Sequence, residues 1–177
     1  MKKSIFLAVV LLIVFISCTP KEQEAEVKVQ VPDLAIYEHQ QTKDVVKLVY
    51  EAVNEIEQSG TKAFEKFRQP GSKWFMKDIY VFVWGMDGMR YVYPPDPAGE
   101  GKNMKDLKDI NGQPIGQEFI ATAGNGEGWV FYMWNKPGAT EPETKTTFIK
   151  KAVDNDGKEY LVGCGLYGMP REKVFEE

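Results

Sequence analysis

The fold is decided by residues 79–93, which read IYVFVWGMDGMRYVY. Every residue from 79 to 84 is β-branched or aromatic, which is typical of a strand in a buried sheet. A second run, rich in aromatic and apolar residues, occupies positions 89–93. Asp87-Gly88 stands between the two runs, and Asp-Gly in that position is a strong hairpin signal. The stretch therefore predicts two antiparallel strands.

Upstream of the hairpin the apolar residues follow the period of a helix. Their spacing of three and four predicts a long amphipathic helix from about residue 37 to residue 58. Ser59-Gly60 ends it, because glycine suits the left-handed position that follows a helix. A short second helix is expected at residues 61–68. The apolar stripe of the long helix consists of Val45, Leu48, Val49, Ala52, Val53 and Ile56.

Downstream of the hairpin the sequence predicts one more helix and three more strands. Pro94-Pro95 ends the second strand of the hairpin, and Pro114 is placed to start a helix that continues to Ala123. The later strands are expected at residues 129–134, 145–153 and 158–167. This order of elements predicts an α+β domain in which the long helix packs on a five-stranded, mostly antiparallel sheet.

The first 35 residues are expected to export and tether the domain. Lys2 and Lys3 precede an apolar run of about 12 residues, a length that fits a signal peptide and is short of the roughly 20 that span a bilayer. The run ends at Ser17-Cys18 and resembles a lipobox in which Phe15 replaces the usual leucine. We therefore expect a lipoprotein signal peptide at residues 1–17, a lipid on Cys18 and a flexible tether at residues 18–35. An uncleaved membrane anchor is the alternative, and both place the domain outside the cytoplasm.

The rest of the chain is expected to form one domain at residues 36–168 and a C-terminal tail at residues 169–177. A net charge of −4 without a basic cluster argues against nucleic acid as a partner. Cys164 is the only cysteine besides Cys18, so it is expected to be a buried, inert thiol rather than half of a disulfide. No second apolar segment follows the last strand, so we expect the domain to act through a partner protein.

Short motifs lie in a fixed order along residues 40–167. They include YVFV at 80–83, GKN at 101–103, DLKD at 106–109, GEGWV at 126–130 and YLVG at 160–163. Together they resemble the single Cache domain family, many members of which have histidine where this chain has Tyr93 before Pro94. The resemblance implies a PAS-like fold with the long helix on one face of the sheet and a small-molecule pocket on the other. It also implies an extracellular ligand-binding module of chemoreceptors and histidine kinases, and dimerisation through the long helix.

Aromatic residues gather in the expected strands, where they either line a pocket or fill the core. Alternation puts Tyr132 and Trp134 on one face of their strand and Trp129 and Phe131 on the other. Tyrosine and tryptophan suit a pocket because each combines an apolar ring with a hydrogen-bonding group. We predict ligand contacts from Trp84, Tyr91, Tyr93, Tyr132, Trp134, Lys145, Phe148 and Lys150.

Lysines are the expected polar contacts, because an ammonium in an otherwise apolar strand can pair with a ligand carboxylate. Lys145 and Lys150 are separated by an odd number of residues, so a regular strand places them on opposite faces and at most one faces the pocket. Arg90 in the hairpin is a further candidate. The resemblance implies small organic acids, amino acids or amines as ligands, and a pocket lysine favours a small carboxylate.

No enzyme activity is expected. His39 is the only histidine, so neither a histidine-based metal cluster nor a Ser-His-Asp arrangement is easily built. We predict no catalytic residue, no metal and no cofactor. The alternative to ligand binding is a structural or adaptor lipoprotein that keeps the fold and fills its pocket with aromatic side chains, because a lined pocket and a filled one share one sequence pattern.

Overall fold

The computed structural model describes residues 29–175, so the expected signal peptide, Cys18 and the tether up to residue 28 lie outside the described residues. The helices are α1 (Gln40–Ser59), α2 (Ala63–Phe67) and α3 (Ile115–Gly124), with 3₁₀ turns η1 (Leu34–Ile36), η2 (Gly60–Lys62), η3 (Pro97–Gly99) and η4 (Arg171–Lys173). The strands are β1 (Phe75–Met76), β2 (Ile79–Tyr80), β3 (Phe82–Gly85), β4 (Arg90–Val92), β5 (Glu127–Asn135), β6 (Pro142–Val153) and β7 (Glu159–Tyr167).

Five strands form one sheet in the order β4-β3-β7-β6-β5, and all neighbouring pairs are antiparallel. This confirms the predicted α+β fold. The run at residues 79–84 is divided, because the amide of Val81 donates to the carbonyl of Trp74 at 2.9 Å instead of joining the large sheet. As a result β2 pairs with β1 in a separate two-stranded sheet, which the sequence analysis did not predict.

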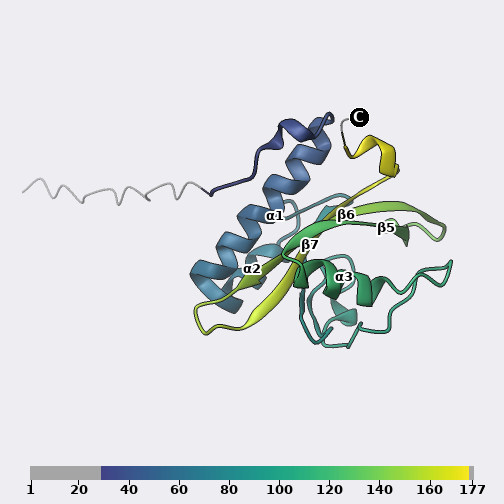
Figure 1. Ribbon diagram of the computed structural model, residues 1–177. Coiled ribbons are helices and arrows are strands. Elements are labelled where there is room, and N and C mark those ends of the chain that lie inside the picture. Colours follow the sequence, from purple (N-terminus) through teal and green to yellow (C-terminus); the bar gives the residue numbers. More distant parts are fainter. Residues whose placement is uncertain (1–28, 176–177) are drawn as a thin grey trace, which may run out of the picture.

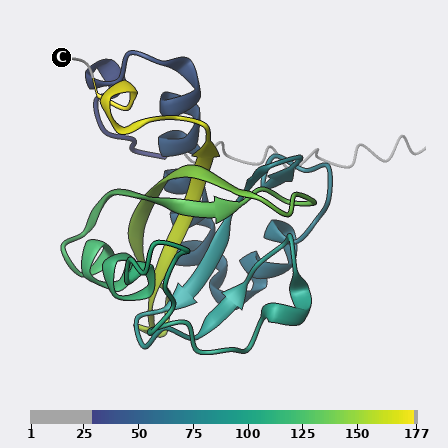
Figure 2. The same ribbon diagram turned by 90° about the vertical axis from the view of Figure 1, so that its right-hand side faces the viewer.

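The sheet is covered on both faces. Helix α1 packs across one face, mainly over β6 and β7, and α3 lies against the other (Figures 1 and 2). Five residues of the predicted α1 stripe are buried, and Leu48 is partly buried. Val46, which was not in the predicted stripe, is also fully buried. Gly60 ends the helix with a φ of 57°, a conformation that glycine adopts without strain. The two faces give two apolar cores, one under α1 and one under α3.

A β-bulge in the hairpin changes which side chains share a face. Val83 pairs with Val92, but the next residue, Trp84, pairs with Arg90, so Tyr91 is the extra residue on β4. In a regular strand Arg90 and Tyr93, three residues apart, would face opposite ways. The bulge brings both to the α3 side of the sheet and turns Tyr91 to the α1 side.

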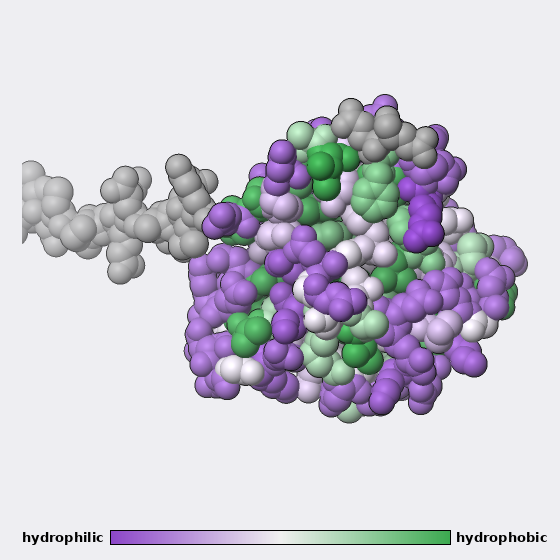
Figure 3. Space-filling model, viewed as in Figure 1, coloured by the Kyte–Doolittle hydropathy of each residue, from purple (hydrophilic) through white to green (hydrophobic). Residues whose placement is uncertain are grey.

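The C-terminal segment packs onto the domain and extends it past residue 168, where the domain was expected to end. Met169 and Val174 are buried in the core under α1, and the ring of Phe175 lies 6.3 Å from that of Tyr37. The segments at the two ends of the described chain therefore meet near the start of α1. On the face seen in Figure 3 apolar residues gather near this end, and Ile36 and Phe175 remain exposed. No helix among residues 29–175 is long and apolar enough to cross a membrane.

The outer edge of β5 is partly occupied by the loop that leads into α3. The amide of Met133 donates to Oδ2 of Asp109 at 3.0 Å, and Nε2 of Gln113 donates to the carbonyl of Phe131 at 2.9 Å. Asp109 is itself held by the amides of Asn111 and Gln113. The Met133 amide and the Phe131 carbonyl thus have hydrogen-bond partners within the protein, whereas the outward-facing backbone groups of an edge strand are usually left to hydrogen-bond water.

Candidate ligand-binding site

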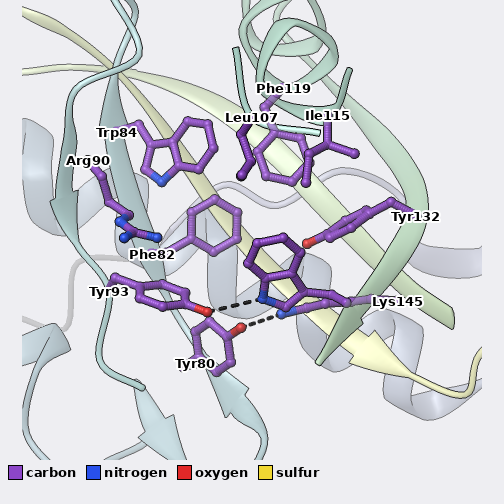
Figure 4. A pocket seen from close by; sticks show the side chains of 11 residues that line it. Tyr80, Phe82, Trp84, Arg90, Tyr93, Leu107, Ile115, Phe119, Tyr132 and Lys145 are labelled. Atoms are coloured by element: carbon purple, nitrogen blue, oxygen red, sulfur yellow. Dashed lines mark hydrogen bonds between the residues drawn. The ribbon is translucent and has the colours of Figure 1, made fainter. Parts of the chain in front are cut away.

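The core under α3 encloses a small cavity (Figure 4). Two glycines of β7 leave room for it, because Gly163 and Gly165 present no side chain to this face. The ring of Phe82 lies over Gly163, and the Lys145 side chain lies over Gly165. The cavity is lined by Tyr80, Phe82, Trp84, Arg90, Tyr93, Leu107, Ile115, Phe119, Tyr132, Trp134 and Lys145.

Lys145 is a buried cation in the wall of this cavity. Only 1% of the residue is exposed. Its Nζ donates to the hydroxyl of Tyr80 at 2.6 Å and to that of Tyr167 at 3.2 Å, and it lies 4.1 and 4.5 Å from the centroids of these rings. Within residues 29–175 no carboxylate lies within ion-pairing distance of this ammonium, and Asp78 pairs instead with Lys136 at 3.0 Å.

The missing counter-charge changes the proton affinity of the site. Burial lowers the pKa of Lys145 to about 7, although the negative charge of Asp78 acts in the opposite direction. Burial also raises the pKa of the Tyr80 and Tyr167 hydroxyls, and it raises that of the Cys164 thiol to about 12. Near neutral pH these neighbours are uncharged, so the lysine is the group in this cluster that titrates.

A second cation, Arg90, lines the opposite part of the cavity (Figure 4). It is 6% exposed, and its Nε and Nη2 donate to the carbonyl of Gly99 at 2.9 and 2.7 Å. Its guanidinium lies 4.4 Å from the ring centroid of Tyr93. These contacts attach the loop after β4 to the hairpin and fix the position of Tyr93.

Aromatic rings form the remaining walls and leave little space. Phe119 packs against Tyr132 at 5.3 Å between centroids, and the hydroxyl of Tyr132 hydrogen-bonds Oγ1 of Thr147 at 3.0 Å. Nε1 of Trp134 donates to the hydroxyl of Tyr93 at 3.1 Å. The space open to the centre of a water-sized sphere is about 20 Å³. Since a water needs roughly 10–15 Å³ on this measure, the cavity holds about one water.

Five of the eight residues predicted to contact a ligand meet around the cavity. They are Trp84, Tyr93, Tyr132, Trp134 and Lys145. The alternation argument for β5 agrees with the structure, since Tyr132 and Trp134 lie on the cavity side and Trp129 and Phe131 lie on the α1 side.

The other three predicted residues lie on the α1 side of the sheet, away from the cavity. Phe148 stacks on Tyr50 of α1. Lys150 pairs with Glu127 at 2.6 Å, so the two lysines do lie on opposite faces and Lys145 is the one at the cavity. Tyr91 is the bulge residue and packs with Phe64 and Tyr160 instead. The prediction of Tyr91 as a ligand contact is therefore wrong, because the bulge turns it to the α1 side.

Several lining residues were not among the predicted contacts. Arg90 was only a further candidate, and the bulge, which nothing in the sequence signals, brings it to the cavity. Tyr80 and Phe82 belong to the aromatic run that decides the fold, and their spacing of two to Trp84 was an available signal. Ile115 and Phe119 come from α3, where helical periodicity marks them only as core residues. Nε1 of Trp84 is buried without a hydrogen-bond partner in the described part of the chain.

Substituting Gly165 tests whether the glycines of β7 shape this site. A Cβ on Gly165 would lie 2.8 Å from the carbonyl oxygen of Thr146 and 2.9 Å from Cε of Lys145, and closer still to Oγ1 of Thr147. We expect Gly165→Ala to destabilise the protein by about 1–3 kcal/mol, the usual cost of overpacking, because a strand carbonyl cannot move aside. Thermal melting measures this as a fall of several degrees. Gly124→Ala is the control, since a Cβ there meets nothing within 4 Å; equal effects of the two substitutions would contradict the prediction.

A helix-backed antiparallel sheet with an aromatic-walled cavity on its other face defines a domain of the PAS-like class. The chain belongs to the Single Cache domain 2 family, whose model matches residues 22–168. The resemblance noted in the sequence motifs is thereby confirmed.

Relatives of this chain are sensor proteins. The sensor histidine kinase MctS of Rhizobium johnstonii is 37% identical over 91 residues, which cover 51% of this chain and 19% of the kinase. The methyl-accepting chemotaxis protein McpP of Pseudomonas putida is 28% identical over 91 residues, which cover 51% of this chain and 16% of that protein. The matched region thus spans less than a fifth of either relative.

Solved structures share the fold. A Cache chemosensory domain that recognises carboxylic acids matches with a TM-score of 0.58 at 23% identity, over 72% of this chain and 93% of that domain. The periplasmic sensor domain of a chemotaxis protein matches with a TM-score of 0.56 at 26% identity, over 72% of this chain and 90% of that chain.

Proposed function

We propose that this protein is an extracytoplasmic sensor or solute-binding domain that recognises a small carboxylate in the cavity under α3. The observation that carries the proposal is Lys145, a cation buried in the cavity wall without an acidic partner among the described residues. Burying such a charge costs free energy unless a counter-ion arrives. A ligand carboxylate supplies that counter-ion, and the Tyr80 and Tyr167 hydroxyls are within reach to orient it.

The similarity to sensor proteins supports the functional class. A sensor kinase and a chemoreceptor each contain a region like this one, and one domain of the same fold recognises carboxylic acids. That domain shares the architecture with this chain, and the ligand assignment here depends on Lys145. We further propose that a lipid on Cys18 holds the domain at the membrane, that a partner protein receives the signal, and that α1 contributes to a homodimer. No catalytic role is proposed.

Thermal melting of the full chain in detergent against small carboxylates, amino acids and amines tests the proposal. A ligand that binds only the folded state adds about 2.7 kcal/mol at 100 times its Kd, which is a shift of several degrees for a domain of this size. We expect acids of two to four carbons to produce the shift and amines to produce none. A shift from amines alone would overturn the carboxylate assignment.

The small volume of the cavity favours a second candidate, an adaptor that has filled its pocket. With space for about one water, the described state cannot hold even a two-carbon acid without movement of its walls. An adaptor gives a flat melting panel for all three ligand classes. Its partner would then be sought by pull-down of the membrane-anchored chain.

A further inference from the structure

Two aromatic side chains from opposite edges of the sheet meet over the cavity. Tyr93 directly follows β4, and Trp134 lies near the end of β5, so β3, β7 and β6 separate them within the sheet. Their side chains nevertheless join through the hydrogen bond from Nε1 of Trp134 to the hydroxyl of Tyr93, at 3.1 Å. Figure 4 draws this hydrogen bond as a dashed line beside the one between Lys145 and Tyr80. The pair therefore bridges the concave face of the sheet.

The bridge is the part of the wall that can move most easily. Of the eleven lining residues, only Tyr93, Leu107 and Trp134 are partly exposed, and the other eight are buried. The backbone of Leu107 is fixed by hydrogen bonds with Met104 and Gly116. Tyr93 is fixed by the Arg90 guanidinium and by an edge contact with Tyr80 at 5.7 Å.

Trp134 has fewer restraints than its partner. Its indole makes one hydrogen bond, to Tyr93, and one edge contact, to Tyr132 at 6.1 Å. It is the penultimate residue of β5, paired with Glu143 beside the hairpin turn. Rotation of this side chain therefore breaks one hydrogen bond, to Tyr93, and one aromatic contact, to Tyr132.

We propose that the Trp134–Tyr93 hydrogen bond is a gate, which closes the cavity around a water-sized space and opens by rotation of Trp134 to admit a ligand. The biological role of this gate rests on the proposed function, because the gate would control the access of a ligand to Lys145. The gate can also be tested without a ligand. Trp84 lines the same cavity and its buried indole N–H has no partner among the described residues, so its exchange with solvent reports on opening of the cavity.

Exchange kinetics of propionate with the full chain in detergent test the gate. Trp134→Phe keeps most of the ring bulk and removes the donor. Because the closed cavity has room for about one water, bound propionate keeps the gate open. We therefore expect kon to rise about fivefold, the factor that corresponds to one neutral hydrogen bond, koff to change less than twofold, and Kd to fall about fivefold. Trp129→Phe is the matched control, because Nε1 of Trp129 donates to the Tyr37 hydroxyl at 3.2 Å on the α1 side of the same strand. A rise in koff alone would make Trp134 a ligand contact and overturn the gate.

A ligand-free measurement separates failure of the gate from failure of the proposed function. Hydrogen exchange of the Trp84 indole, followed by NMR of the ¹⁵N-labelled protein below its melting range, requires solvent to enter the cavity. We expect Trp134→Phe to speed this exchange about fivefold and Trp129→Phe to leave it unchanged. An unchanged rate in Trp134→Phe overturns the gate even if propionate binds. If Trp84 exchange becomes faster but propionate does not bind, the gate is supported and the carboxylate assignment is overturned.

Discussion

Replacing Lys145 with methionine is expected to abolish binding of small carboxylates and to make the protein more stable. Loss of one partner from a buried charge pair typically costs about 2–5 kcal/mol, so affinity should fall at least about 30-fold. Methionine fits the space over Gly165 and carries no charge, so the ligand-free protein should gain about 1–4 kcal/mol in free energy of unfolding. Titration calorimetry measures the first effect and urea denaturation the second.

Lys150→Met provides the matched control for that substitution. Lys150 lies on the same strand but on the α1 side, where it pairs with Glu127 and lies 4.3 Å from the Tyr50 ring centroid. Its loss should leave carboxylate affinity unchanged. If Lys145→Met kept its affinity, the ligand carboxylate would have to bind Arg90, the other buried cation of the cavity, instead of Lys145.

Carboxylate affinity should also fall steeply as the pH rises above neutrality. The ligand-free site has its Lys145 pKa at about 7, and a carboxylate binds the ammonium form. Affinity is therefore constant below pH 7 and falls about tenfold for each pH unit above it, until the pKa of the bound state is reached. Calorimetry between pH 6 and 9, in buffers of different ionisation enthalpy, should detect proton uptake on binding above pH 7. A flat profile to pH 9, or one unaltered in Lys145→Met, would contradict this assignment.

The same lysine gives the ligand-free protein a stability that changes with pH in the opposite sense. Its pKa is lower in the folded than in the unfolded protein, so between pH 7 and 10.5 the unfolded state binds more protons. Stability should therefore rise with pH above 7, by up to about 1.4 kcal/mol per unit, and be lost as the pH falls through 7. The Cys164 thiol, whose pKa is raised from 9.0 to about 12, opposes this trend above pH 9. The slope from pH 7 to 8.5 should disappear in Lys145→Met.

Much of this arrangement could be predicted because it depends on local periodicity. The stripe from Val45 to Ile56 predicts α1 and its buried face, and alternation separates Lys145 from Lys150 and Tyr132 from Phe131. Alternation does not tell which of the two faces packs against α1 or how β6 is aligned with β5. In the structure Tyr132 pairs with Lys145, and Glu127 pairs with Lys150. This alignment of β6 with β5 depends on long-range register, which local alternation does not determine. The prediction of Phe148 as a ligand contact is wrong, since it packs against Tyr50 on the α1 side.

Other features depend on backbone geometry that no pattern in the sequence signals. The bulge at Tyr91 exchanges one residue between faces, and it alone brings Arg90 and Tyr93 to the same side. The bridge between Tyr93 and Trp134 joins side chains from the two edges of the sheet, which no local pattern places together. The packing of the C-terminal segment depends on Met169 and Val174, two isolated apolar residues in a polar stretch that shows no periodicity.

The contacts of Asp109 and Gln113 with β5 also bear on how the molecule behaves at high concentration. An uncovered edge strand is a template on which a second chain can add its own strand and start an insoluble assembly. With the Met133 amide and the Phe131 carbonyl already engaged, incoming chains find fewer free backbone groups along this edge. Loss of Asp109 would thus first become visible as lower solubility in concentrated samples, while the walls of the cavity, none of which Asp109 forms, would stay in place.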